Sequence, residues 1–181
     1  MKLKFDLKAT VIISLTLFVL GGLFILKNIF EKDFIINSSN SLPHYVYRLS
    51  HMTEPITKNS IVLICNDKNK SPEVYRMLEK LHPQIVDTES IHCKGRITPL
   101  IKKIGALPGS YLISGRDREA MVDSQQLEGT IPHRTIKAFT FDGIVPADSV
   151  FVYTPHKDSL DSRYFGFISG SEIVDVLIPV F

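Results

Sequence analysis

The longest hydrophobic run lies near the N-terminus, at residues 9–26, where 18 residues pass without a charge. An α-helix of this length spans about 27 Å, just enough to cross the hydrocarbon core of a bilayer. A buried helix of a soluble protein would normally keep a polar face, and this run has none. We therefore predict one transmembrane helix over residues 9–27.

Basic residues stand mainly on one side of this run. Lys2, Lys4, Lys8 and the terminal amine precede it, whereas residues 27–33 carry mixed charge. The positive-inside rule then keeps residues 1–8 in the cytoplasm and exports the rest. A cleaved signal peptide is the alternative, but no Ala-x-Ala pattern follows and the run is longer than a usual signal core. The pattern favours an uncleaved, single-pass anchor.

Beyond the anchor, apolar residues recur in short stretches separated by turn residues, which is typical of strands. The predicted strands are 34–36, 44–49, 60–66, 100–109, 111–113, 120–122, 135–139, 150–153, 164–168 and 173–178. Many short strands indicate a mainly β domain over residues 34–181, with a coiled or barrel-like sheet.

A single stretch within this domain has helical spacing. Ser71 is a capping residue and Pro72 suits the first helical position. Three apolar residues then fall on one helix face: Val74, Leu78 and Leu81. Pro83 is expected to end the helix. We predict a small, peripheral helical insertion.

Two lysines interrupt the apolar strand 100–109. Neighbouring residues on a strand point to opposite faces, so Lys102 and Lys103 cannot share an environment. Burial lowers the pKa of a lysine, by up to about 3–5 units when it is complete. A lysine that is neutral near pH 7 can take a proton from a hydroxyl as a general base. The alternative is an edge strand whose lysines guard against aggregation.

Two polar clusters could accompany such a base. Asn-Ser-Ser-Asn-Ser at 37–41 offers hydroxyl nucleophiles, or else is a flexible linker. In the second cluster, 155–166, Asp161 and Arg163 stand two apart, so on extended backbone they share a face with Ser159 and can pair. A solvated turn is the alternative there.

Composition narrows the functional classes. The chain has 181 residues and a net charge of +2, without a basic stripe interleaved with aromatics, so a nucleic-acid partner is not expected. Six histidines are scattered without the spacing of metal ligands, and the phosphate- and dinucleotide-binding motifs are missing. We expect no metal and no cofactor.

The two cysteines, Cys65 and Cys93, flank the predicted helix. With the anchor oriented as above, both lie in an oxidising compartment, so a disulfide is expected. It would close a loop of about 29 residues, which the chain-entropy model values at roughly 3–4 kcal/mol. Two free buried thiols are the alternative.

Three motifs in one order, Ser41-Leu-Pro, Ile101-Lys-Lys-Ile-Gly-Ala-Leu-Pro-Gly109 and Asp158-Ser-Leu-Asp-Ser-Arg-Tyr-Phe-Gly166, follow the single anchor. Together they resemble the serine, lysine and Asp-Ser-Arg boxes of the type I signal peptidase family, the Ser/Lys proteases. The resemblance spans roughly residues 34–181 and is weakest over 66–92.

Finer features are similar to the conjugative-transfer (TraF type) branch, which processes pilin. They are Leu42-Pro43, Cys93-x-Gly, His156 and the closing Ile-Pro-Val-Phe. The chain departs from the family pattern in having Lys103 where Arg is usual, Ser110 where Asp is usual, and His44-Tyr45 where a glycine is common.

The resemblance implies roles for six residues. Ser41 is expected to be the nucleophile and Lys102 the general base, which leaves Lys103 the outward position. Ser39 matches the side-chain donor of the oxyanion hole, Ser159 the residue that orients the lysine amine, and Asp161 with Arg163 a structural ion pair. His156 as the base of a Ser-His-Asp triad is a weaker alternative.

The resemblance further implies a serine endopeptidase in the inner membrane, with a periplasmic catalytic domain and an exported precursor, specifically a prepilin, as substrate. Cyclisation of the pilin by its own amine is a variant of the same chemistry. A non-catalytic subunit of a pilus or type IV secretion complex that retains the fold is the alternative.

Overall fold

The computed structural model describes residues 7–39, 41–67, 69–81, 89–96, 98–115, 120–128, 136–156 and 159–180. The chain separates into two units, Met1–Phe34 and Ile35–Phe181. Residues 1–6, which are most of the predicted cytoplasmic N-terminus, and residue 181 lie outside the described residues. So do Pro83, the predicted end of the helix, and Thr135, the predicted start of a strand.

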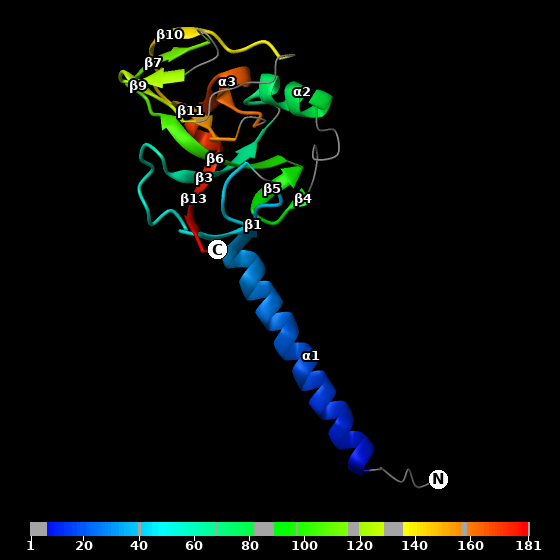
Figure 1. The fold of residues 1–181 in the computed structure, drawn as a ribbon. Coiled ribbons are helices and arrows are strands. Elements are labelled where there is room, and N and C mark those ends of the chain that lie inside the picture. The colour runs from blue at the N-terminus through cyan, green and yellow to red at the C-terminus, as the bar shows by residue number, and fades with distance from the viewer. Residues whose placement is uncertain are drawn as a thin grey trace. The chain divides into compact units, whose positions relative to one another are not determined.

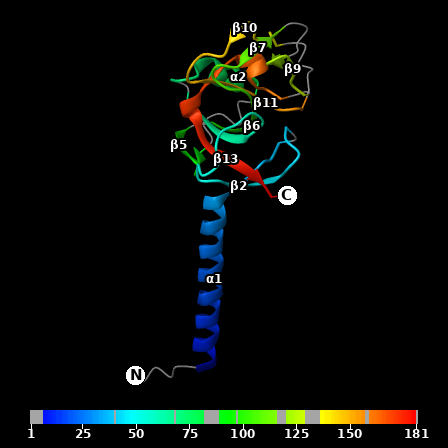
Figure 2. The same ribbon diagram turned by 90° about the vertical axis from the view of Figure 1, so that its left-hand side faces the viewer.

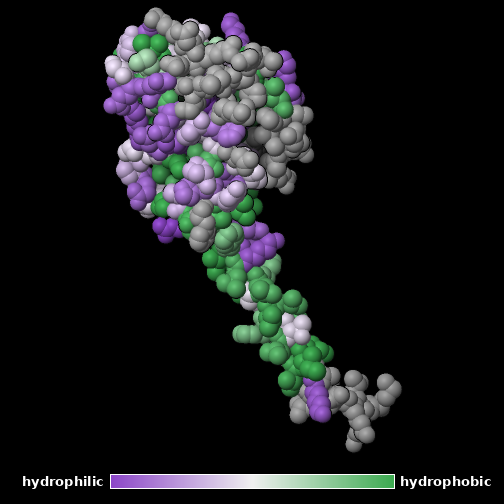
Figure 3. All heavy atoms as spheres, in the orientation of Figure 1, coloured by the Kyte–Doolittle hydropathy of each residue, from purple (hydrophilic) through white to green (hydrophobic). Residues whose placement is uncertain are grey.

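The first unit is a single helix, α1 (Leu7–Asp33). Within it, Thr10–Asp33 is long and apolar enough to cross a membrane. Its side chains are exposed and largely hydrophobic, and Figure 3 shows green spheres along nearly all of α1. A helix that is apolar on every side is stable only where an apolar phase covers it.

The second unit is built on antiparallel strands (Figures 1 and 2). A seven-stranded curled sheet has the order β1-β2-β13-β3-β6-β11-β12. These strands are β1 (Phe34–Ile36), β2 (Val46–Leu49), β3 (Ile61–Asn66), β6 (Thr98–Ala106), β11 (Ser149–Tyr153), β12 (Ile168–Ser169) and β13 (Ile173–Pro179). The predicted mainly β fold is therefore confirmed.

Two smaller sheets complete the domain. The four-stranded sheet has the order β10-β7-β8-β9, with β7 (Tyr111–Ser114), β8 (Ala120–Val122), β9 (Gln125–Gln126) and β10 (Phe141–Ile144). The two-stranded sheet pairs β4 (Glu89–Ser90) with β5 (Cys93–Arg96). A buried cluster joins the four-stranded sheet to the large one: Ala106, Leu112, Ala120, Val122, Leu127, Val145, Phe151 and Tyr153.

The helical insertion, α2 (Pro72–Leu81), is less peripheral than predicted. Val74 and Leu78 are buried in the largest core cluster together with Val62, Ile64 and Ile104 of the central strands. Leu81, the third residue predicted for this face, is exposed. The amphipathic helix therefore covers one face of the large sheet.

The strand predicted at 135–139 is wrong. Residues 137–140 have no regular structure, and the strand that pairs with β7 is β10, six residues later. Ile136 and Phe139 are apolar because they pack against the core as isolated side chains. The N–H of Phe139 donates to the carbonyl of Arg163 instead of to a strand.

The strand predicted at 164–168 is also wrong over most of its length. Ser162–Phe165 forms a short helix, α3, and β12 starts only at Ile168. The side chain of Asp161 accepts the backbone N–H of Arg163 and caps the helix. Gly166, at φ 81°, ends it in a conformation that favours glycine. This turn brings the Asp-Ser-Arg motif against the large sheet.

Candidate active site

Lys102 is buried on strand β6, in the interior of the large sheet, and is only 6% exposed. Its backbone neighbour across the sheet is Val62 on β3. Lys103 points to the opposite face, half-buried, with its ammonium 5.7 Å from the centre of the Tyr153 ring. The pleat of β6 thus gives the two lysines different environments, and only Lys102 is removed from water.

The amine of Lys102 has a specific partner, since Nζ donates a hydrogen bond to Ser159 Oγ at 2.9 Å. Burial lowers the pKa of Lys102 from 10.5 to about 8; Asp161 opposes this shift and Arg163 adds to it. A pKa of about 8 leaves about a tenth of the amine neutral at pH 7, against far less for an ordinary lysine, and the neutral amine has the lone pair that a general base needs.

Asp161 and Arg163 form a buried ion pair beside this lysine. Arg163 donates to Asp161 through Nη2 at 2.6 Å and through Nε at 2.8 Å. Burial alone would lower the pKa of Arg163, but its hydrogen bond to Asp161 and the charge of that carboxylate raise the pKa overall. The bonding to Asp161 thus offsets the cost of burying the guanidinium of Arg163.

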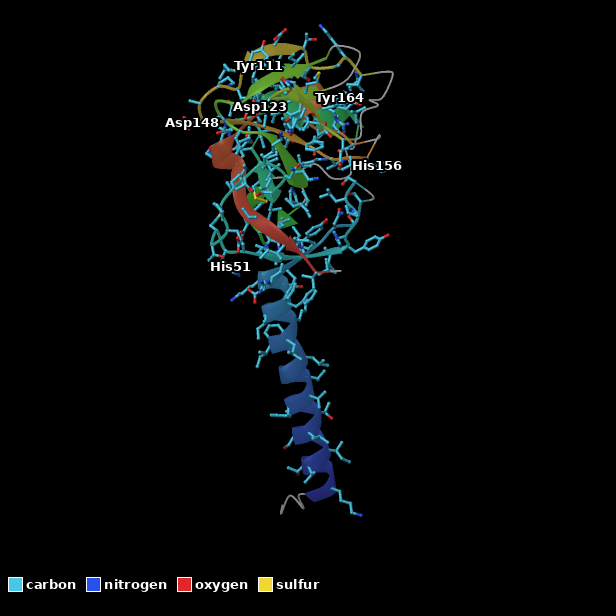
Figure 4. The ribbon with its side chains drawn as sticks, turned by 60° about the vertical axis from the view of Figure 1, so that its left-hand side comes forward. His51, Tyr111, Asp123, Asp148, His156 and Tyr164 are labelled. Atoms are coloured by element: carbon cyan, nitrogen blue, oxygen red, sulfur yellow. A yellow bond between two sulfur atoms is a disulfide. The ribbon has the colours of Figure 1, made fainter. Side chains whose placement is uncertain are left out.

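The pair is made on a helix and not on the extended backbone that the sequence predicted. The carboxylate of Asp161 caps α3 and accepts the N–H of Thr154, and Arg163 donates to the carbonyl of Thr154 at 3.0 Å. His156 and Tyr164, labelled in Figure 4, lie near the two ends of the segment that carries Ser159 and the ion pair. The ion pair thus ties α3 to the end of β11.

Ser39 and Ser41 lie on the loop between β1 and β2. Their hydroxyl oxygens are 2.6 Å apart. Leu42 anchors the loop because it is buried in a cluster with Tyr47 and Leu63. Ser41 is half-buried and Ser39 is exposed, so this part of the site faces solvent.

The structure therefore brings the predicted residues together as three pairs: Lys102 with Ser159, Asp161 with Arg163, and Ser39 with Ser41. Within the described ranges, no hydrogen bond joins Ser41 to Lys102. The serine pair and the lysine pair are therefore positioned separately, and their meeting as a catalytic dyad stays a prediction.

Sequence reasoning missed two residues at the site. Asn37 accepts hydrogen bonds from Ser39, and its place two residues before a serine is a recognised turn signal. Thr154 is completely buried beside the ion pair, and its hydroxyl has no hydrogen-bond partner among the described residues. Nothing in the sequence distinguishes Thr154 from any threonine at the end of a strand.

A disulfide joins Cys65 to Cys93, linking β3 to β5 at the base of the helical insertion. A cavity of about 370 Å³ lies beside it and is lined by Cys65, Asp67, Lys70, His92, Ser171, Glu172 and Val174. Among the residues the structure describes, no group of three or more His, Cys, Asp or Glu side chains is placed to hold a metal ion.

The match with known families is extensive. The model of the family described as "Signal peptidase, peptidase S26" matches residues 7–181, nearly the whole chain. The chain belongs to this signal peptidase family. The resemblance inferred from the three motifs is confirmed, and the family assignment includes the N-terminal helix.

Two curated relatives within this family are close enough to compare. The chain is 26% identical over 153 residues to the conjugal transfer protein TraF of Agrobacterium tumefaciens (strain 15955), covering 81% of each chain. It is 30% identical over 145 residues to a probable conjugal transfer protein TraF of Sinorhizobium fredii, covering 77% of this chain and 72% of the relative.

Among solved structures, a signal peptidase I from Enterococcus faecalis V583 matches with a TM-score of 0.40 and 18% identity, covering 70% of this chain and 98% of that one.

Proposed function

We propose that this signal peptidase family member is a membrane-anchored serine endopeptidase with Ser41 as nucleophile and Lys102 as general base. The observation that carries the proposal is the environment of Lys102: a lysine buried in the sheet, with its pKa lowered to about 8 and its amine held by Ser159. A buried amine that is partly neutral near pH 7 is costly to maintain, so its presence needs a chemical reason.

The proposed reaction has two stages. Ser41 Oγ attacks the scissile carbonyl carbon and its proton passes to Lys102 Nζ. The tetrahedral oxyanion accepts hydrogen bonds from the hydroxyl of Ser39 and the backbone N–H of Ser41. Collapse breaks the peptide bond, and the leaving amine takes the proton from Lys102. Water then attacks the acyl-enzyme, with Lys102 again as base, and releases the carboxylate product.

Each remaining site residue supports the base in this proposal. Ser159 fixes the rotamer of Lys102 by accepting its hydrogen bond. Arg163 and Asp161 hold the turn that carries Ser159, because Asp161 caps α3 and both contact Thr154. The positive charge of Arg163 also helps to keep the lysine amine neutral.

For the substrate, we propose an exported precursor, and specifically a prepilin of a conjugation system. The support is the similarity to two proteins named for conjugal transfer, together with an N-terminal helix able to cross a membrane. The proposed topology has a cytoplasmic N-terminus and a periplasmic domain in the inner membrane. Attack of the pilin's own amine on the acyl-enzyme would give a cyclic product in place of hydrolysis.

A non-catalytic subunit of a pilus or type IV secretion complex is the second candidate. It is favoured by one observation, namely that no hydrogen bond joins Ser41 to Lys102 among the described residues.

The test incubates the purified full-length protein, in detergent micelles, with candidate prepilins and measures product masses. We expect cleavage by the wild type, none by Ser41→Ala or Lys102→Ala, and substantial cleavage by the matched control Lys103→Ala. A cyclic product would be lighter than the linear one by one water. Cleavage that persists in Ser41→Ala would contradict the mechanism. Pilus assembly that survives in both inactive variants would instead support the structural subunit.

A further inference from the structure

Asn37 closes the loop that carries the two serines. It is 5% exposed, and its backbone N–H donates to the carbonyl of Tyr45 at 2.8 Å. Its side-chain Nδ2 donates to the carbonyl of His44 at 3.2 Å. Asn37 therefore contacts the far end of the loop with both its backbone and its side chain, and Ser39 and Ser41 lie between these contacts.

The contact with His44 fixes the orientation of the Asn37 amide. A carbonyl oxygen only accepts hydrogen bonds, so the atom facing His44 must be the nitrogen, and the oxygen faces Ser39. This oxygen accepts the N–H of Ser39 at 3.1 Å and its hydroxyl at 2.8 Å. The hydroxyl proton of Ser39 therefore points at Asn37.

This assignment determines the direction of the next hydrogen bond. A serine hydroxyl has one proton, and that of Ser39 is already committed to Asn37. In the 2.6 Å contact between the two serines, Ser41 must then be the donor. The structure thus holds a chain of hydroxyl protons that runs from Ser41 to Ser39 and ends at Asn37.

The proposed reaction requires these two hydroxyl protons to point in other directions. The proton of Ser41 must pass to Lys102, and the hydroxyl of Ser39 must donate its hydrogen bond to the oxyanion. We propose that Asn37 is a positioning residue that controls the Ser39 hydroxyl: it holds that proton in the free enzyme and releases it to the oxyanion while still holding the Ser39 backbone. The catalytic consequence rests on the proposed function, whereas the control of the proton does not.

An amide oxygen suits this role because it is a neutral acceptor. Hydrogen bonds to an ionised acceptor are roughly twice as strong, so a carboxylate at position 37 would hold the Ser39 proton too tightly. An alanine there would leave the Ser39 hydroxyl free to donate to any anion at position 41. Asn37→Asp and Asn37→Ala should therefore act in opposite directions, provided Ser39 keeps its hydroxyl.

The test needs no substrate. Ser41→Cys introduces the only free thiol, because Cys65 and Cys93 are bonded to each other. The thiolate reacts with iodoacetamide, so the alkylation rate at fixed pH reports how well the site stabilises an anion at position 41. In full-length Ser41→Cys protein in micelles, we expect slower alkylation with Asn37→Asp and faster alkylation with Asn37→Ala, differing by about tenfold.

The same three proteins are then made with Ser39→Ala. The proposal predicts that the difference shrinks to within about twofold, because the hydroxyl through which Asn37 acts is gone. An undiminished difference would mean that the charge at position 37 acts through space, and no difference in either background would mean that Asn37 does not control the proton; either result overturns the proposal. Asn59→Asp makes the same substitution on another turn and should leave the rate unchanged.

Stability is measured alongside by thermal melting. If Asn37→Ala does not fold, two comparisons remain: Asn37→Asp against unchanged Asn37, once with Ser39 and once with Ser39→Ala. Together they still show whether Asn37 acts through the Ser39 hydroxyl. Where a precursor is cleaved, Asn37→Asp should lower kcat by about 100-fold, with KM unchanged. A wild type that cleaves nothing would count against the proposed function alone, since the thiol measurement is independent of it.

Discussion

The two halves of the candidate site are built in opposite ways. The lysine half, with Lys102, Ser159, Asp161 and Arg163, is buried throughout, and its polar groups are held by the sheet and by α3. The serine half lies on a loop whose two serine hydroxyls are exposed or half-buried, and the loop is held by two buried residues, Asn37 and Leu42.

This difference follows from what each half must do. A lysine is neutral near pH 7 only when it is desolvated, and desolvation requires a rigid, dry environment. A nucleophile must reach a carbonyl that arrives from outside, so it needs access and a short, well-directed loop. Substitutions in the lysine half should therefore change both stability and catalysis, while those of Ser39 and Ser41 should change catalysis alone.

The largest loss of stability is expected for Asp161→Asn, in the lysine half. It leaves the buried guanidinium of Arg163 without its counter-charge, which typically destabilises a protein by about 3–5 kcal/mol. Urea unfolding at pH 7 measures the effect. As a matched control, Glu73→Gln removes a carboxylate from an exposed ion pair with Arg76 and should change stability by less than about 0.5 kcal/mol. Similar values for the two variants would show that the Asp161–Arg163 pair is not structural.

Ser39→Ala tests the serine half. Loss of one oxyanion donor should lower kcat by about 10²–10³-fold, and the midpoint of urea unfolding should change little because the side chain is exposed. Precursor cleavage followed by mass spectrometry gives the rate. If the variant lost stability as well, the separation of roles between the two halves would fail.

Lys102→Met should stabilise the protein, with a pH dependence of known sign. The folded pKa of about 8 lies below the ordinary 10.5, so the unfolded chain binds more protons between these values and wild-type stability rises with pH across that window. Below pH 8 the wild type carries the full cost, up to about 3 kcal/mol. Denaturant melts at pH 6, 8 and 10 should show a gain that shrinks toward pH 10. A difference near zero at all three values would falsify the buried-base assignment.

The smallest effect is expected for Thr154→Val, which keeps the shape of a buried side chain beside the ion pair. Because its hydroxyl has no partner among the described residues, removing it should be neutral or stabilise by about 1 kcal/mol. Thermal melting of Thr154→Val and Thr154→Ser distinguishes the hydroxyl from the methyl group. Destabilisation by valine with tolerance of serine would reveal that the hydroxyl is used.

The sequence predicted the lysine half better than the serine half. Strand alternation was enough to place Lys102 and Lys103 on opposite faces of the sheet. Neighbouring side chains on a strand point to opposite faces whatever packs against each face. The same two-residue period gave the wrong backbone for Asp161 and Arg163, which pair at the start of a helix and not on a strand. The helix begins there because the Asp161 carboxylate accepts the backbone N–H of Arg163, and alternation of residue types does not reveal such a cap. Alternation also failed at Phe139, whose ring is partly buried against the core although the residue belongs to no strand.

The serine half depends on contacts that no periodicity records. The hydrogen bond by which the Asn37 side chain holds the loop depends on where the carbonyl of His44 lies, seven residues away. The motif resemblance identified Ser39 and Ser41 as candidates, but the direction of the hydrogen bond between them follows only from the orientation of the Asn37 amide. Hydrogen-bond direction is set by three-dimensional geometry, which a list of residue types does not contain.

The disulfide between Cys65 and Cys93 makes the intervening chain a closed covalent ring, with its ends 5.5 Å apart at Cα. A protease that cuts this ring once releases no fragment, and the two pieces run as one species on a gel until they are reduced. Val74 and Leu78 would stay tethered beside the core that they fill. Insertions or deletions within the ring would likewise leave the pairing of β3 with β6 in register.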